Sequence, residues 1–169
     1  DPALADESLI PDHSTLHVLD EGWHATVGGH EKVNARYTAL HDNLLDLSHV
    51  SFLHGDTIGS PGVAQTEPEF LQTSNRLDVA RYIKGDKVDH LPLAKALSMT
   101  GLVDRDMVQQ FFAPGLHCTG SSFRSAEQGG DVPGKAYGSF RVIHGITPET
   151  ESTTHYFWAF CRNFHQTDE

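Results

Sequence analysis

The sequence of 169 residues has little cysteine and no paired cysteine motif. Its two cysteines, Cys118 and Cys161, belong to no Cys-x-x-Cys or Cys-x-His pair. A zinc ribbon or an iron–sulfur cluster needs such pairs, so both are excluded from these residues. Two cysteines also make no disulfide framework, and we therefore expect a reducing, cytoplasmic location.

Positive charge and long apolar runs are also scarce. Twelve Lys and Arg against 23 Asp and Glu give a formal net charge of −11. This balance argues against a nucleic-acid partner, which would require clustered basic residues. No apolar run approaches the roughly 20 residues of a membrane-spanning helix, so we expect no membrane partner. The first residues also lack the basic and apolar regions of a signal peptide.

The spacing of apolar residues predicts an α+β fold in one domain. Tyr37 and the leucines that follow recur at intervals of three and four, which predicts an amphipathic helix over 36–48. A loop follows at 59–62, and a second short helix is expected at 92–99. Short turns rich in Gly and Pro separate the strands, which implies an antiparallel sheet. The candidate strands are 14–27, 68–73, 76–84, 104–113, 115–124, 135–146 and 153–163, with a hairpin loop at 125–134.

The segment from Asn43 to His54 sets polar residues at intervals into an apolar helix-like stretch. Asn43, Asp46 and His49 are three residues apart and would share one face of a helix. His54 lies about 140° further round an ideal helix than His49. Both imidazoles can reach one metal ion only if the helix ends or bulges near Ser51.

Two interpretations of these histidines follow. An ordinary helix could carry two incidental histidines, one of them at its C-terminus, where a cation is favourable. Alternatively, two neutral imidazoles with a nearby carboxylate suit an open Fe(II) site. The apolar neighbours favour the metal site, because they would bury the polar groups, and buried polar groups need partners. These neighbours are Leu44, Leu45, Leu47, Val50, Phe52 and Leu53.

This segment resembles the mononuclear-iron motif of the Rieske non-haem iron oxygenases. It is most similar to the branch that contains the vanillate and dicamba O-demethylases. Flanking stretches at 1–12, 147–151, 155–158 and 162–164 resemble the same branch, so the similarity covers nearly the whole chain. The resemblance implies a helix-grip, START-like fold, in which an antiparallel sheet wraps around a helix.

The resemblance also implies roles for residues of the motif. His49 and His54 would be the imidazole ligands of Fe(II). Asp46 would accept a hydrogen bond from an iron-ligating histidine and link it to a histidine of a Rieske cluster on a neighbouring subunit. Such a carboxylate fixes the tautomer and basicity of the imidazole. Asn43 would lie close to the iron.

Three further residues are candidates for the substrate pocket. His144 matches a substrate-pocket histidine of the dicamba enzyme, although a strand histidine with satisfied hydrogen bonds is an equally open interpretation. Phe112 and Trp158 are candidate pocket aromatics. Large aromatic residues on strands, however, commonly belong to the core.

Two parts of the family pattern are not found in these residues. The resemblance implies that 1–13 are a linker from a Rieske domain and that 14–169 are a partial catalytic domain, incomplete at its C-terminus. The family's third iron ligand, an aspartate, is expected beyond residue 169. Asp168 and Glu169 match the segment that precedes it, and we do not assign either as a ligand.

The function implied by the resemblance is O₂-dependent O-demethylation or another monooxygenation of an aromatic substrate. Electrons would come from NAD(P)H through a reductase or ferredoxin and a 2Fe–2S Rieske cluster, within a homotrimer. We expect this stretch alone to be inactive. One alternative is a non-catalytic helix-grip module that binds a small aromatic molecule. Another is a zinc hydrolase built on His49 and His54, which the absence of a His-Glu-x-x-His motif disfavours.

Overall fold

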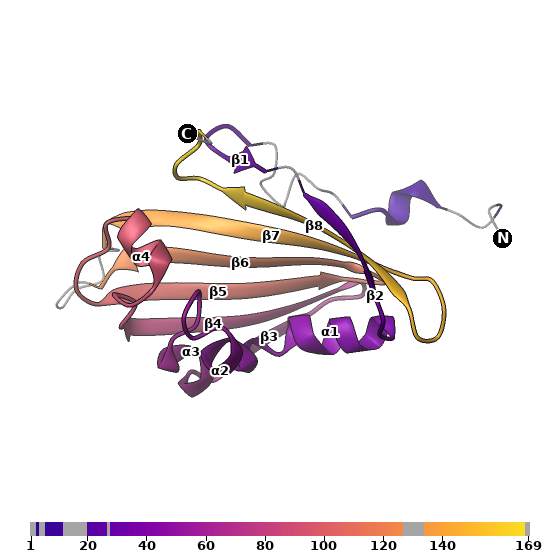
Figure 1. Cartoon of the computed structure of the whole chain (residues 1–169), viewed down its shortest axis with the longest axis horizontal. Coiled ribbons are helices and arrows are strands. Elements are labelled where there is room, and N and C mark those ends of the chain that lie inside the picture. Colours follow the sequence, from indigo (N-terminus) through magenta and orange to yellow (C-terminus); the bar gives the residue numbers. More distant parts are fainter. Residues whose placement is uncertain (1–2, 4–5, 12–19, 27, 127–133, 168–169) are drawn as a thin grey trace.

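The computed structural model describes residues 3, 6–11, 20–26, 28–126 and 134–167. Its main body is one eight-stranded antiparallel sheet (Figure 1). The strands are β1 (His24–Ala25), β2 (Gly29–Val33), β3 (Glu69–Gln72), β4 (Arg76–Asp86), β5 (Val103–Phe112), β6 (Leu116–Ser125), β7 (Ala136–Pro148) and β8 (Thr154–Arg162). They lie in the order β1-β8-β7-β6-β5-β4-β3, and β2 pairs with β8 on the same side as β1.

Short helices lie along one face of this sheet and at one of its ends (Figure 1). They are α1 (Tyr37–Leu45), the 3₁₀ helix η4 (Leu47–His49), α2 (Val50–Leu53), α3 (Pro61–Gln65) and α4 (Pro92–Ala96). A further 3₁₀ helix, η2 (Glu7–Leu9), lies near the N-terminus and apart from the sheet (Figure 1). We call the sheet face that α1 and α2 cover the inner face. Within the described part of the chain no helix exceeds the nine residues of α1, so a long gripped helix is not among these residues.

The predicted α+β class with an antiparallel sheet is confirmed. The six strands expected from 68 onward correspond to β3–β8, and the helix expected at 92–99 corresponds to α4. The agreement follows from the alternation of apolar and polar residues along these segments. Successive residues of a strand point to opposite faces of the sheet, so this alternation marks a strand with one buried face. No described helix is long and apolar enough to cross a membrane.

The N-terminal strand prediction is partly wrong. Of 14–27, residues 14–19 and 27 lie outside the described residues, and β1 accounts for two of the others. β2 was not predicted, because Gly28 and Gly29 were interpreted as the end of a strand. Instead, Gly28 and Gly29 allow close approach to β8: a Cβ on Gly28 would lie 1.9 Å from the carbonyl oxygen of Trp158. The hairpin loop at 125–134 falls largely outside the described residues, and of the linker at 1–13 residues 1, 2, 4, 5, 12 and 13 do so.

The helix predicted over 36–48 ends earlier, at Leu45. Asp46 leaves the helical conformation, with φ −85° and ψ 89°, and its side chain caps η4 by accepting a hydrogen bond from the Ser48 amide. The chain then turns into α2. A further difference is α3, which starts with Pro61 at its first turn where a loop was expected, since proline suits that position.

One of the core clusters fastens the helical segment to the sheet. Leu47 and Val50 pack with Val63, Ile83 and Met107, all buried. Burying such side chains contributes about 1.5–3 kcal/mol each. The expectation that the apolar neighbours bury the polar residues is wrong: Leu47 and Val50 are buried, but Asn43, Asp46 and His54 are exposed and His49 is half-buried. Phe52 and Leu53 are themselves 78% and 74% exposed, because the break at Asp46 turns α2 so that these side chains face solvent.

Candidate metal centre and ligand cavity

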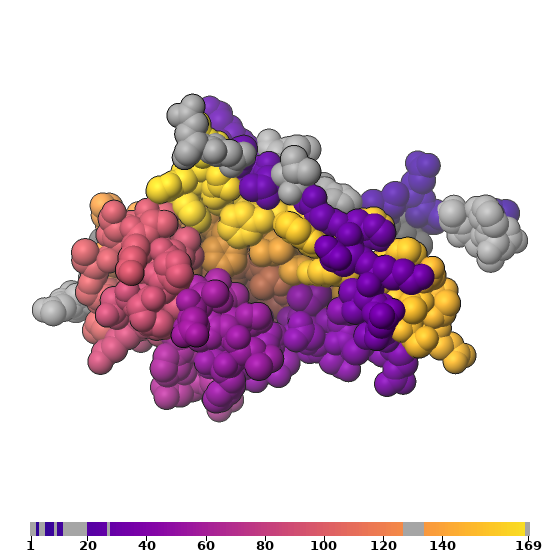
Figure 2. Space-filling model, viewed as in Figure 1, coloured from indigo at the N-terminus to yellow at the C-terminus, as the bar shows by residue number. Residues whose placement is uncertain are grey.

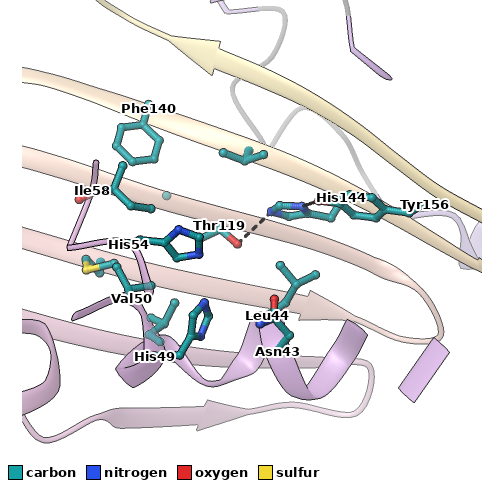
Figure 3. A pocket seen from close by; sticks show the side chains of 15 residues that line it. Asn43, Leu44, His49, Val50, His54, Ile58, Thr119, Phe140, His144 and Tyr156 are labelled. Atoms are coloured by element: carbon teal, nitrogen blue, oxygen red, sulfur yellow. Dashed lines mark hydrogen bonds between the residues drawn. The ribbon is translucent and has the colours of Figure 1, made fainter. Parts of the chain in front are cut away.

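A cavity of about 250 Å³ lies between the helical segment and the inner face of the sheet. Figure 2 shows the molecule hollowed between the helices and β8, with β6 and β7 behind. Figure 3 shows the lining side chains. They are Asn43, Leu44, Leu47, His49, Val50, His54, Ile58, Met107, Thr119, Gly120, Ser121, Phe140, Val142, His144 and Tyr156. The set includes no Lys, Arg, Asp or Glu, so the cavity suits a largely apolar ligand.

His49 and His54 point into the same part of this cavity (Figure 3). Their ring centroids lie 5.4 Å apart, and the ring planes are inclined by 67°. This convergence arises because His49 ends η4 while His54 follows the last residue of α2 in a non-helical conformation, with φ −119° and ψ 21°. The predicted interruption of the helix is therefore present, but it lies at Asp46 and His54 and not at Ser51.

The pair fits a metal ion such as Fe(II) in its donor chemistry. His49 Nδ1 is hydrogen-bonded to the backbone carbonyl of Asp46, which makes Nδ1 the protonated nitrogen and leaves the lone pair of Nε2 free. Metal-binding histidines commonly have this arrangement. The His54 imidazole has no hydrogen bond among the described residues, so it can also donate to a metal. Within the described ranges no group of three His, Cys, Asp or Glu is placed to hold a metal.

Asp46 and Asn43 occupy different positions relative to the cavity. Asn43 lines it from α1. The Asp46 carboxylate is exposed and outside it, and a hydrogen bond from the Ser48 hydroxyl lowers the pKa of Asp46. We expected the Asp46 carboxylate to accept a hydrogen bond from a histidine of the motif. Instead, His49 is hydrogen-bonded to the backbone carbonyl of Asp46. The reason is that the carboxylate caps η4 instead.

His144 projects from β7 into the wall opposite the two histidines (Figure 3). Its Nδ1 lies 2.7 Å from the Tyr156 hydroxyl, and its Nε2 lies 3.2 Å from Thr119 Oγ1. Burial lowers the pKa of His144 to about 4. The imidazole is therefore neutral at physiological pH.

Phe112 and Trp158 do not line the cavity, and both pocket assignments need correction. Phe112 points to the other face of the sheet, where it packs with Cys118 and Ile143, because it is an odd number of residues along β5 from Met107. Trp158 is paired with His144, but its indole lies over Gly29 of β2. The indole therefore extends toward the edge of the sheet and away from the cavity.

Several buried polar residues behind this wall escaped the sequence analysis. His117, fully buried, is hydrogen-bonded through Nδ1 to Gln109 Nε2 at 2.6 Å and through Nε2 to His41 Nδ1 at 2.6 Å. Burial lowers the pKa of His117 to about 3. Thr119 donates its hydroxyl to Gln109 Oε1. A polar residue at an inward position of β5, where an apolar one is usual, was the signal available in the sequence.

Arg105 joins the loop after α2 to the sheet. It is fully buried, donates from Nη1 to the Ile58 carbonyl at 2.7 Å, and donates from Nε to Ser121 Oγ at 3.0 Å. Burial lowers the pKa of Arg105 to about 10, so it remains a cation. The loop that follows His54 is thereby held against β6.

The fold and the site together define a class. The chain is an antiparallel α+β domain whose sheet and helical segment line a cavity on which two histidines converge. Residues 33–169 match the family described as the vanillate O-demethylase oxygenase C-terminal domain, and the chain belongs to this family.

Similar proteins are named as oxygenase components. A vanillate O-demethylase oxygenase subunit of a Pseudomonas species is 31% identical over 99% of this chain and 52% of its own length. The dicamba O-demethylase oxygenase component of Stenotrophomonas maltophilia is 30% identical over 97% of this chain and 46% of its own length. The crystal structure of dicamba monooxygenase bound to 3,6-dichlorosalicylic acid has a TM-score of 0.83 and 28% identity, covering 99% of this chain and 47% of that one. The chain thus spans about half the length of the curated relatives it matches.

Proposed function

We propose that this chain belongs to the catalytic component of a Rieske-type oxygenase that acts on an aromatic substrate at a mononuclear Fe(II). The reaction would be O₂-dependent O-demethylation or another monooxygenation. The observation that carries the proposal is the convergence of His49 and His54 on one largely apolar cavity. The names of the relatives support the same class.

In this proposal, His49 and His54 hold the iron through Nε2 of His49 and a ring nitrogen of His54. The hydrogen bond from His49 Nδ1 to the Asp46 carbonyl keeps the His49 tautomer that can donate to a metal. We expect a third, acidic ligand from outside the described residues. When bound, Fe(II) would supply the activation of O₂. Asn43, on the same wall, would orient solvent near the iron.

The remaining cavity residues would orient the substrate and exclude water. Apolar side chains from both the helices and the sheet line the space, which suits the flat faces of an aromatic ring. His144 and Tyr156 provide the polar end opposite the histidine pair (Figure 3). A ring held between them would present a substituent to the metal.

Asp46 would connect this site to an electron donor. Its carboxylate is exposed and held by Ser48, so it remains accessible to another subunit. We propose that it contacts a Rieske-cluster histidine of a neighbouring subunit in a homotrimer. Electrons would come from NAD(P)H through a reductase or ferredoxin, in the cytoplasm. The names of relatives as components and iron–sulfur subunits of oxygenase systems support such a chain of donors.

Iron content tests the metal assignment. In the full-length oxygenase, purified without oxygen, the mononuclear site should hold about one iron per chain beyond the iron of any Rieske cluster, and His49→Ala and His54→Ala should each lose most of this iron, because two remaining ligands hold Fe(II) weakly. His165→Ala, an exposed histidine outside the cavity, is the control and should keep its iron. Iron that persists in both site variants would refute the assignment. Zinc in place of iron would favour the hydrolase alternative.

Electron delivery tests the role of Asp46. Asp46→Asn should retain iron yet slow substrate-dependent oxygen uptake by about 10–100-fold, the usual effect of removing such a supporting group. Asp42→Asn changes an exposed carboxylate four residues earlier and should leave uptake unchanged. Full oxygen uptake in Asp46→Asn would remove the bridging role.

A second candidate function is a non-catalytic module that binds a small aromatic molecule. It is favoured by the fact that the described residues line a largely apolar cavity from both the helices and the sheet but supply only two candidate metal ligands. Oxygen uptake in the presence of a reductase and methoxylated aromatics separates the two. Binding without uptake by iron-loaded protein would support the module.

A further inference from the structure

One hydroxyl in the cavity wall carries a proton that no described residue accepts. Ser121 lines the cavity from β6 and is 1% exposed. Its Oγ lies 3.0 Å from Nε of Arg105, and since a guanidinium N–H can only donate, Oγ is the acceptor of this bond. A serine hydroxyl also has one proton of its own to donate. Within the described part of the chain the Ser121 hydroxyl makes no second hydrogen bond, so this proton is left for whatever fills the cavity.

Ser121 lies toward the end of the cavity that is opposite to His144 and Tyr156. It is paired with Phe140 of β7, and Figure 3 shows Phe140 and Ile58 at one end of the cavity and His144 and Tyr156 at the other. His144 lies four residues further along β7 than Phe140, which is roughly 13 Å at 3.3 Å per residue. Ser121 and His144 therefore belong to two separate polar positions in one cavity.

The surroundings of the Ser121 hydroxyl are mostly apolar. Its partners on the neighbouring strands are Met107 and Phe140, and both line the cavity, as does Ile58. A buried donor that faces apolar groups is unfavourable unless a ligand or a water molecule supplies an acceptor. The wall at this end therefore marks a place for one acceptor atom.

A buried cation lies directly behind this hydroxyl. Arg105 is fully buried, keeps its charge because burial lowers its pKa only to about 10, and donates to the Ile58 carbonyl at 2.7 Å. Asp86, which accepts a hydrogen bond from Ser60 at 2.6 Å, balances this charge in part. Nη2 of Arg105 has no hydrogen-bond partner among the described residues. The cation therefore polarises the hydroxyl toward donation and favours a negatively charged acceptor in front of it.

We propose that the Ser121 hydroxyl, with the Arg105 guanidinium behind it, donates a hydrogen bond to a carboxylate of the aromatic ligand. Ser121 is then a residue that determines specificity, and Arg105 is the residue that positions and polarises it. The inference deepens the proposed function, because it takes the cavity ligand to be aromatic. It requires no step at the metal.

Calorimetry on the full-length protein tests the donor with two probes of the same shape. The probes are meta-methoxybenzoate and meta-nitroanisole, which differ in a carboxylate against an uncharged nitro group. Ser121→Ala should weaken binding of the benzoate by about 10–100-fold, the effect of one lost hydrogen bond to a charged group, and should change binding of nitroanisole by about twofold or less. Equal losses for the two probes, or no loss for either, would overturn the proposal.

Three further variants separate the hydroxyl from the packing of the wall. Ser121→Thr keeps the hydroxyl and should keep the preference of the wild type for the benzoate. Ser122→Ala removes the next hydroxyl along β6, which points to the other face of the sheet, and should leave both dissociation constants unchanged. If Ser121→Ala does not fold, Ser121→Cys offers a weaker donor of similar size and should lose part of the benzoate affinity. Selective loss of benzoate binding in Ser121→Thr would contradict the proposal.

The same two probes measure the contribution of Arg105. Arg105→Met removes the cation and should weaken benzoate binding by about tenfold relative to nitroanisole, because the hydrogen bond is no longer supported by a charge. Arg105→Lys restores the charge and should recover most of the difference. Equal losses for both probes in Arg105→Met would show that Arg105 only holds the loop after α2, and would refute its role at Ser121.

A His49→Ala background separates this inference from the proposed function. The selective loss caused by Ser121→Ala should persist when His49 is also replaced, because the donor lies in the sheet wall and not at the metal. Disappearance of the selective loss would overturn the inference, since the carboxylate would then be held by the metal. Absence of iron from the wild type would instead refute the proposed function and leave this test unchanged.

Discussion

At the residue scale, the buried histidines of the inner face are the least ordinary feature of the chain. His117 is fully buried and His144 is 7% exposed, and each has hydrogen-bond partners for both ring nitrogens. Satisfied partners explain how a neutral imidazole is tolerated where an apolar side chain is usual. Because both imidazoles are buried in the neutral form, the stability of the fold should depend on pH.

We predict that stability falls as the pH decreases from about 6.5 toward 4. The folded-state pKa values of His117 and His144 are about 3 and about 4, below the ordinary value of 6.5. Over this range the unfolded chain takes up protons that the folded chain does not, so acid favours unfolding, by up to about 1.4 kcal/mol per pH unit for each histidine.

Chemical denaturation at a series of pH values measures this slope. A His117→Gln variant should show a shallower slope than the wild type, because one of the two histidines no longer titrates on unfolding. A free energy of unfolding that stays constant between pH 6.5 and 4.5 would contradict the prediction.

Sequence reasoning recovered part of the site at this scale. The motif identified His49, His54 and Asn43, all of which line the cavity, and the family resemblance identified His144. Gln109 and the other buried polar residues were missed. Their spacing in sequence carries no sign of their contacts, since His41 and His117 are 76 residues apart.

At the element scale, the turn after α2 places His54. The His54 carbonyl accepts hydrogen bonds from the amides of Thr57, Ile58 and Gly59, and the last of these is 2.7 Å long. Gly59 is buried against the carbonyl of Val50. The turn can therefore close only if residue 59 has no side chain.

Gly59→Ala should open this turn. A Cβ there would lie 2.1 Å from the Val50 carbonyl oxygen, so the backbone must shift, at a cost of about 1–3 kcal/mol. Thermal unfolding should show a lower midpoint, and iron content should fall with the displacement of His54. Gly145→Ala is the control, because its Cβ would come no closer than 3.6 Å to Phe157. Equal midpoints in the two variants would show that the turn tolerates a side chain.

At the scale of the whole molecule, the core near α4 is separate from the cluster that fastens the site segment. Val88, Leu91, Ala94, Met99 and Val103 pack with Phe123 and Phe140 at one end of the sheet. The other cluster lies under η4 and α2. Stability and metal binding should therefore respond to different substitutions.

Leu91→Ala should destabilise the fold by about 2–5 kcal/mol, because it leaves a cavity at a residue that is 1% exposed. The matched control, Leu102→Ala, changes a side chain that is 49% exposed and should cost about 0.5 kcal/mol or less. Denaturant unfolding measures both. Below the unfolding transition, Leu91→Ala should retain the iron content of the wild type. Loss of iron by the folded variant would show that the two clusters are coupled.

The amino-acid sequence by itself determined the strands from 68 onward and the motif from Asn43 to His54, because alternation and local spacing are properties of neighbouring residues. Only the tertiary structure decided that Asp46 breaks the helix, that Phe112 faces away from the cavity and that Gln109 is hydrogen-bonded to His117 and Thr119. Each of these depends on strand register or on a contact between distant residues. Such contacts are selected by the packing of the whole sheet, and no local pattern in the chain specifies them.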